Sequence, residues 1–129
     1  MNELDYNTIT EFPNTEVSIL QLKRCFQRYM FARNHIVGGK VIEVGCGGGQ
    51  GLNLLKDVSD ELIGYDIDEQ NVEKCKETYY HDNKIRISKE DIETIDFKQN
   101  SIQTVILFET IYYLNNHHKF FNNLYKALK

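Results

Sequence analysis

The sequence predicts an open α/β fold, in which helices cover both faces of a parallel sheet. Short apolar runs rich in β-branched residues alternate with longer segments whose apolar residues recur at helical spacing. A glycine cluster and several acidic residues each follow directly after one of the apolar runs. Since ligands of such sheets bind beyond the carboxyl ends of the strands, these residues are the candidates for a functional site.

Four strands and four helices account for the pattern. We expect strands at residues 40–44, 62–66, 85–87 and 104–108. We expect helices at residues 15–35, 52–57, 69–80 and 117–128, with Thr15 as the N-cap of the first. The apolar residues expected inside are Ile19, Leu22, Phe26, Tyr29, Met30 and the Arg33 stem in the first helix, Val72, Cys75 and Tyr79 in the third, and Phe120, Phe121, Leu124, Tyr125 and Leu128 in the last.

Composition indicates one soluble domain. The chain has 129 residues, of which 41% are hydrophobic and 26% charged, and its net charge is −4. An acidic balance argues against a nucleic-acid partner, because phosphate backbones need clustered Lys and Arg. The N-terminus has no signal-peptide pattern, no apolar run approaches a membrane span, and three scattered cysteines predict neither a disulfide framework nor a metal site. We therefore expect a cytoplasmic protein with reduced thiols.

The segment from Glu43 to Gly51 is the strongest functional signal. Glycines at this turn, between a strand and a helix, let a ligand touch bare backbone and unpaired N–H groups. A plain tight turn is the alternative. The dinucleotide pattern G-x-G-x-x-G fails at Gln50 when counted from Gly45, and at Leu52 when counted from Gly47. A phosphate-binding P-loop is also absent.

What remains is an acidic residue two positions before G-x-G-x-G. This resembles motif I of class I S-adenosylmethionine-dependent methyltransferases, which have a Rossmann-like fold. The resemblance implies that S-adenosyl-L-methionine is the cofactor and that the acid suits its ammonium and sulfonium charges. The cofactor-binding residues that it implies in this segment are Glu43, Gly45, Cys46, Gly47 and Gly49.

Asp66 ends the second expected strand, 23 residues after Glu43. A carboxylate at this position can accept hydrogen bonds from both ribose hydroxyls of an adenosine-type ligand. Ile67 beside it could cover one face of the adenine. The alternative is a solvated turn, since Asp68 and Glu69 follow closely.

The resemblance extends to two later segments. After the third strand it implies that Asp91 receives the adenine amino group, with Ile92 beside it. After the fourth strand it implies that the backbone carbonyl of Phe108 or Glu109 binds the methionine ammonium. The family often has Asp at the start of that strand, where this chain has Gln103-Thr104.

The segments at residues 11–16 (EFPNTE) and 28–32 (RYMFA) resemble the leader of some bacterial class I methyltransferases, which folds over the cofactor as a lid. We therefore divide the chain into an arm and helix at residues 1–37 and a partial methyltransferase domain at residues 38–129. Arg28 or Tyr29 could meet the carboxylate of the cofactor, although Tyr29 also fits a purely structural place in the core.

A full class I domain has seven strands, whereas four are expected here, so we predict a truncated domain. Its fourth strand would form an apolar sheet edge, which invites self-association. No catalytic residue is predicted: Tyr113, His117 and His118 lie in the correct region, but each is equally explained by packing or exposure. The predicted function is methyl transfer to a small molecule; the alternatives are a non-catalytic binding module and, less well supported, an NAD-dependent oxidoreductase.

Overall fold

The computed structural model describes residues 19–129, so the arm at residues 1–13 and the Thr15 cap lie outside it. Four parallel strands form one sheet in the order β3-β2-β1-β4. They are β1 (Lys40–Val44), β2 (Glu61–Asp66), β3 (Ile85–Lys89) and β4 (Thr104–Ile106). This arrangement confirms the predicted α/β class and the predicted number of strands in the described part of the chain.

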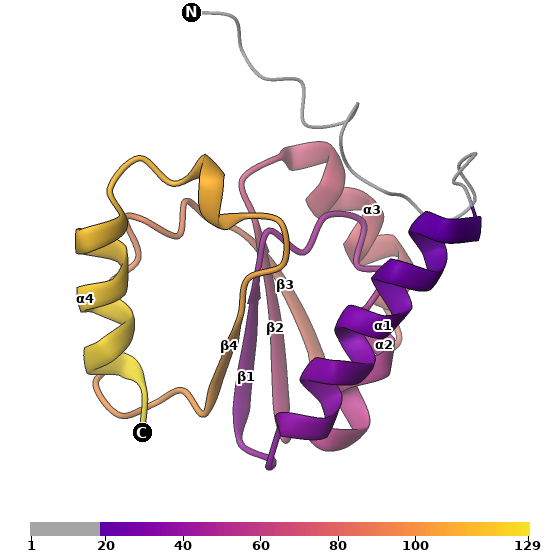
Figure 1. The fold of residues 1–129 in the computed structure, drawn as a ribbon, viewed down its shortest axis with the longest axis horizontal. Helices are drawn as coiled ribbons and strands as arrows, with labels where there is room; N and C mark the ends of the chain where they lie inside the picture. Colours follow the sequence, from indigo (N-terminus) through magenta and orange to yellow (C-terminus); the bar gives the residue numbers. More distant parts are fainter. Residues whose placement is uncertain (1–18) are drawn as a thin grey trace, which may run out of the picture.

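Helices lie on both faces of the sheet (Figure 1). One face carries α1 (Ile19–His35), α2 (Leu52–Leu55) and α3 (Glu69–Tyr79), and the other carries α4 (His117–Ala127). Short 3-10 turns, η2 (Lys56–Val58) and η3 (Ile111–Tyr113), follow α2 and precede α4. Within residues 19–129, no helix is long and apolar enough to cross a membrane.

Two apolar cores fill the space between the sheet and its helices. Alternate residues of β1 serve different cores, because successive side chains of a strand point to opposite faces: Val41 belongs to the first core, while Ile42 and Val44 belong to the second. The first core also contains Tyr29, Leu52, Leu55, Leu62 and Cys75. The second contains Ile92, Ile102, Leu114, Phe120, Leu124 and Ala127.

The predicted buried face of α1 is largely wrong. Ile19, Leu22 and Phe26 are exposed, and Tyr29 is the one buried residue of the helix. The apolar spacing is helical, but the first turns of α1 extend beyond the sheet, so no described residue covers them (Figure 1). Spacing therefore predicted the helix correctly and its contacts incorrectly.

The predicted inner face of α4 is too wide. Phe120, Leu124 and Ala127 are buried, whereas Phe121 and Tyr125 are exposed. These three buried positions lie on one narrow stripe of a helix, which is all that a single sheet face covers. In α3, the prediction holds for Val72 and Cys75, which are buried. Tyr79 packs against the first core, which contains Cys75.

Strand β4 ends at Ile106, two residues before the predicted end. Leu107 and Phe108 leave the sheet, and Glu109 adopts a positive φ of 55°. This turn brings Thr110 to the carboxyl end of β1, where its hydroxyl lies 3.1 Å from the Val44 carbonyl oxygen. Among the described strands, β4 pairs with β1 alone and so forms one edge of the sheet.

Candidate functional site

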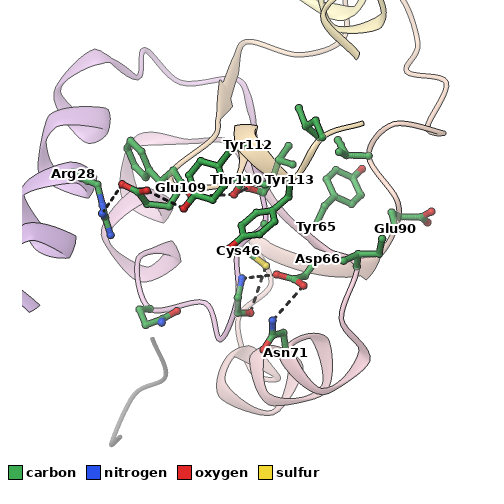
Figure 2. A pocket seen from close by; sticks show the side chains of 18 of the residues that line it. Arg28, Cys46, Tyr65, Asp66, Asn71, Glu90, Glu109, Thr110, Tyr112 and Tyr113 are labelled. Atoms are coloured by element: carbon green, nitrogen blue, oxygen red, sulfur yellow. Dashed lines mark hydrogen bonds and ion pairs between the residues drawn. The ribbon is translucent and has the colours of Figure 1, made fainter. Parts of the chain in front are cut away.

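A cleft of about 580 Å³ opens at the carboxyl ends of the strands. Figure 2 shows part of its lining, which comes from the turns after all four described strands and from α1. Eight predicted site residues line it: Gly45, Cys46, Gly47, Asp66, Ile67, Asp91, Ile92 and Phe108. Two others, Glu43 and Gly49, do not. Its volume falls in the range of small-molecule sites.

The glycine turn is anchored by its own N–H groups, so several N–H groups expected to be unpaired there are instead paired: the Gly47 N–H donates to Asp66 Oδ2 and the Gly49 N–H to the Cys46 carbonyl. The N–H groups of Gly45 and Cys46 donate to the Tyr65 carbonyl at 2.8 and 3.0 Å, which ties the turn to β2. Gly45 has a φ of 71°, and a Cβ there would overlap the Thr110 side chain. Because any larger residue would be strained at this φ and would also displace Thr110, glycine is needed at this position.

Asp66 is bound directly to the glycine turn. Its Oδ2 accepts a hydrogen bond of 2.8 Å from the Gly47 N–H. Its Oδ1 accepts from the Asp68 N–H at 2.9 Å and from the Asn71 Nδ2 at 3.3 Å. Burial raises the pKa of Asp66, and these hydrogen bonds oppose that effect. A carboxylate offers about four acceptor positions, of which three are used, and Asp66 lines the cleft.

The third strand end supplies a mixed polar and apolar wall. Asp91 accepts a hydrogen bond from the Glu93 N–H at 3.0 Å through Oδ1, which orients its carboxylate. Ile92 is buried in the second core, while Ile67, on the neighbouring turn, is half exposed. Two aliphatic side chains and an oriented acid suit a flat heterocycle that carries an amino group.

Glu43 lies beneath the turn rather than in the cleft. It is 1% exposed, and its Oε1 accepts a hydrogen bond from the Tyr29 hydroxyl. Its Oε2 has no hydrogen-bond partner among the described residues. Burial raises the pKa of Glu43 to about 8, although the Tyr29 hydrogen bond lowers it and the nearby Asp66 raises it further. The carboxyl group is therefore mostly protonated at neutral pH.

Tyr29 connects α1 to three parts of the site. Besides its bond to Glu43, its ring meets Phe108 edge-on, with ring centroids 5.3 Å apart and planes at 84°. The ring also lies on Gly51, where a Cβ would overlap it. Tyr29 belongs to the first core, as its structural alternative predicts, and it also lines the cleft. A contact between Tyr29 and the carboxylate of the cofactor stays a prediction.

Arg28 approaches the turn after β4 from the same helix. Its Nη1 donates to Glu109 Oε1 at 3.3 Å, and the Tyr112 hydroxyl donates to Glu109 Oε2 at 3.0 Å (Figure 2). The positive φ of Glu109 is unusual for a residue with a side chain and costs about 1–3 kcal/mol. Its carboxylate is nevertheless held on both oxygens.

Sequence reasoning missed two residues that hold the site together. The Asn71 side chain is 1% exposed and braces Asp66, and the Thr110 hydroxyl lies within hydrogen-bond distance of the Val44 and Phe108 carbonyls, at 3.1 and 3.0 Å. Asn71 could have been found as a polar residue on the buried face of α3, one position before Val72. Thr110 carries no such signal, because its role depends on the turn formed by Glu109.

Comparison with known protein families identifies one that covers most of the chain. The family model described as "Methyltransferase domain" matches residues 42–129, which is more than half of the chain. The chain belongs to this methyltransferase family. The match begins within β1 and includes the glycine turn and all later strands of the domain.

A relative from Mycolicibacterium smegmatis, named a probable S-adenosylmethionine-dependent methyltransferase, is 27% identical over 112 residues. The match covers 80% of this chain and 42% of the relative. The chain therefore spans less than half the length of this curated relative.

Solved structures share the fold. The YcgJ protein from Bacillus subtilis has a TM-score of 0.73 and 16% identity, over 81% of this chain and 47% of that one. An S-adenosylmethionine-dependent methyltransferase from Mesorhizobium loti has a TM-score of 0.68 and 19% identity, over 79% and 48%. A Haemonchus contortus phosphoethanolamine N-methyltransferase in complex with S-adenosylhomocysteine has a TM-score of 0.73 and 20% identity, over 81% and 26%.

Proposed function

We propose that this methyltransferase domain binds S-adenosyl-L-methionine in the cleft and serves methyl transfer to a small-molecule acceptor. One observation carries the proposal: the hydrogen bond between Asp66 Oδ2 and the Gly47 N–H. It fixes the acid at the end of β2 against the glycine turn, so that one ligand can touch a carboxylate and bare backbone together. A nucleoside with a charged tail needs that combination.

In this proposal the Asp66 carboxylate accepts a hydrogen bond from one ribose hydroxyl at its remaining acceptor position. Ile67 and Ile92 enclose the adenine, and Asp91 accepts from the adenine amino group. The backbone carbonyl of Phe108 accepts a hydrogen bond from the methionine ammonium. Gly45, Cys46 and Gly47 supply the backbone surface, whereas Glu43 and Gly49 support it from outside the cleft.

The sulfonium of the bound cofactor supplies an activated methyl group. The chain's own contribution is then alignment of cofactor and acceptor, which can contribute about 7–11 kcal/mol to lowering a barrier. None of the described residues is assigned as a general base. We propose that residues 1–37 act as a lid, because Arg28 and Tyr29 of α1 already line the cleft.

A binding module without turnover is the second candidate. The chain spans 42% of its curated relative and 47% of the YcgJ structure, and no general base is assigned among its described residues. Turnover of any acceptor by the 129-residue chain would exclude this candidate. Binding of S-adenosylhomocysteine without turnover across a panel of acceptors would favour it.

Self-association through β4 belongs to the same proposal. Val105 and Leu107 pack only partly against the second core, and β4 is an edge among the described strands. An apolar edge offers unpaired N–H and C=O groups to a second chain. Light scattering should show a concentration-dependent dimer, and a monodisperse monomer would contradict this part of the proposal. We expect no nucleic-acid or membrane partner and a cytoplasmic location.

The central experiment is calorimetric titration of the chain with S-adenosylhomocysteine and, separately, with NAD. We expect saturable binding of S-adenosylhomocysteine and none of NAD, because the glycine spacing lacks the third dinucleotide glycine. Asp57→Asn, which removes an exposed carboxylate away from the cleft, is a control and should bind equally well. Binding of NAD alone would reject the proposal.

A further inference from the structure

The α1 side of the cleft carries an excess of positive charge. Arg24 and Arg28 lie four residues apart on α1 and both line the cleft. Positions four apart are neighbours on a helix surface, where like charges repel. Arg28 is paired with Glu109, whereas no acidic side chain among residues 19–129 lies within ion-pair distance of Arg24. Within residues 19–129, Glu109 is therefore the one acidic side chain that pairs with either of these two guanidinium groups.

The opposite wall has the reverse charge. Its acidic residues come from the ends of β2 and β3 and are Asp66, Glu90, Asp91 and Glu93. A cleft with one acidic and one basic wall selects the orientation of its ligands. The proposed nucleoside site uses the acidic wall, whereas the one role considered so far for the basic wall is a contact between Arg28 and the carboxylate of the cofactor.

The basic wall continues outside the cofactor cradle. A second, shallow hollow is lined by Arg24, Gln27, Arg28, Phe31 and Phe108. It contains no residue of the glycine turn and no strand-end acid. Phe31 is 65% exposed, so an apolar surface stands beside the two guanidinium groups. A group bound in this hollow would lie outside the glycine turn and the strand-end acids, while still touching the two arginines that line the cleft.

Arg28 has unused donor capacity. Its Nη1 is engaged by Glu109, while its Nε is buried and has no hydrogen-bond partner within the described part of the chain. Carboxylates and phosphates bind arginine through two parallel N–H groups. An anion that displaces Glu109 and reorients the Arg28 side chain could therefore satisfy this Nε–H, which is unpaired within the described residues and costs free energy.

From these observations we propose that Arg24 and Arg28 bind a carboxylate or phosphate group of the methyl acceptor, whose apolar part lies on Phe31 and Phe108. In this arrangement Glu109 is the counter-ion that the acceptor's anionic group displaces from Arg28. The inference rests on the proposed cofactor site, because it gives the neighbouring hollow to the acceptor.

Phenyl phosphate is a suitable probe, with benzyl alcohol as its neutral counterpart. Binding of each is measured by NMR titration, with and without saturating S-adenosylhomocysteine. We expect phenyl phosphate to bind at least about tenfold more tightly than benzyl alcohol, since charge-assisted hydrogen bonds exceed one factor of ten in affinity. Equal binding of the two probes would overturn the inference.

Three substitutions are expected to change the affinity for phenyl phosphate, each in a defined direction. Arg24→Gln and Arg28→Gln should each weaken phenyl phosphate binding by about tenfold, while Glu109→Gln should strengthen it because a competing carboxylate is lost. Lys23→Gln makes the same charge change at an exposed position on α1 outside both hollows, and should leave binding within about twofold. Stronger binding after Arg28→Gln, or weaker binding after Glu109→Gln, would contradict the inference.

The cofactor's own carboxylate is the competing source of the anion. Methylthioadenosine lacks the amino-acid part, so it separates the two sources. If Arg24→Gln and Arg28→Gln weaken S-adenosylhomocysteine but not methylthioadenosine, and phenyl phosphate does not bind, the pair serves the cofactor and the inference is wrong. If S-adenosylhomocysteine does not bind at all, the proposed function fails, while the phenyl phosphate titration without it still tests the anion site.

Discussion

The Tyr29 hydroxyl donates a hydrogen bond to Oε1 of Glu43, and this bond joins α1 to the end of β1 directly beneath the glycine turn. Both partners are buried, and Glu43 is 1% exposed. A single contact thus links the helix that covers the cleft with the strand from which the turn emerges. The stability of the protein should therefore depend on the hydrogen bond between Tyr29 and Glu43.

Tyr29→Phe keeps the ring on Gly51 and Phe108 but removes the donor to Glu43. Because Oε2 already has no described partner, the variant leaves the whole buried carboxyl group without a protein donor. We expect the free energy of unfolding to fall by about 1–3 kcal/mol. Urea denaturation measures it, and Tyr125→Phe, at a residue 83% exposed, should change stability by less than about 0.5 kcal/mol. Equal stability of both variants would contradict the prediction.

Gly51→Ala tests the contact between α1 and the glycine turn. The φ of Gly51 is −97°, so the backbone accepts any residue, and alanine would ordinarily stabilise the start of α2. The overlap of a methyl group with the Tyr29 ring reverses the sign, and we expect a loss of about 1–3 kcal/mol.

A double-mutant cycle separates this overlap from other effects. The penalty of Gly51→Ala should shrink in a Tyr29→Leu background, because the ring that the methyl group meets is gone. Asn53→Ala, on the exposed side of α2, is the matched control and should cost little. Thermal denaturation of the four proteins gives the coupling, and an additive cycle would show that Tyr29 is not the obstacle.

Asp66→Asn tests the proposed ribose contact. We expect S-adenosylhomocysteine to bind about tenfold to a hundredfold more weakly, because a charged acceptor of a hydroxyl proton is lost. Since Asp66 also braces the Gly47 N–H, circular dichroism must show that the variant is folded. Analogues lacking the 2′- or 3′-hydroxyl isolate the contact: one of them should lose affinity for the original protein and not for the variant. Calorimetry that shows the same preference in both would refute the contact.

Much of this fold was predictable because its signals are local. The β-branched run at Lys40–Val44 and the glycines after it define a strand and a turn without reference to distant residues, and strand-end topology then places Asp66, Asp91 and Phe108 at one edge. These features follow from short-range sequence and one general rule of parallel sheets. The rule predicts their proximity, whereas their roles in binding remain predictions.

The remaining features depend on how α1 and the turn after β4 are placed, which no local pattern encodes. Glu43 was predicted to face the cofactor, but its side chain points to the face that α1 covers, where Tyr29 reaches it. The exposure of Phe26 follows from where the sheet ends beneath α1. The role of Thr110 follows from the positive φ of Glu109. Since this position holds neither glycine nor asparagine, the sequence does not predict a positive φ there.

The pKa of Glu43 predicts how stability changes with pH. Burial raises the pKa of this carboxyl group from 4.5 to about 8 in the folded protein. Between these values the folded state keeps a proton that the unfolded state releases, so the free energy of unfolding falls as pH rises through this window. Below pH 4.5 the carboxyl group is protonated in both the folded and the unfolded state, so it no longer makes the free energy of unfolding depend on pH.

Glu43→Gln keeps the shape and the acceptor for Tyr29 but cannot titrate. We expect the original protein to lose stability between pH 5 and pH 8, with a slope of at most about 1.4 kcal/mol per pH unit from this group, whereas the variant lacks this component. At pH 8 the variant should therefore equal or exceed the original in stability, while at pH 5 it should not. Urea denaturation across this range measures both curves. Parallel curves would show that Glu43 is ionised in the folded protein throughout, and that the Tyr29 hydroxyl stabilises its charge.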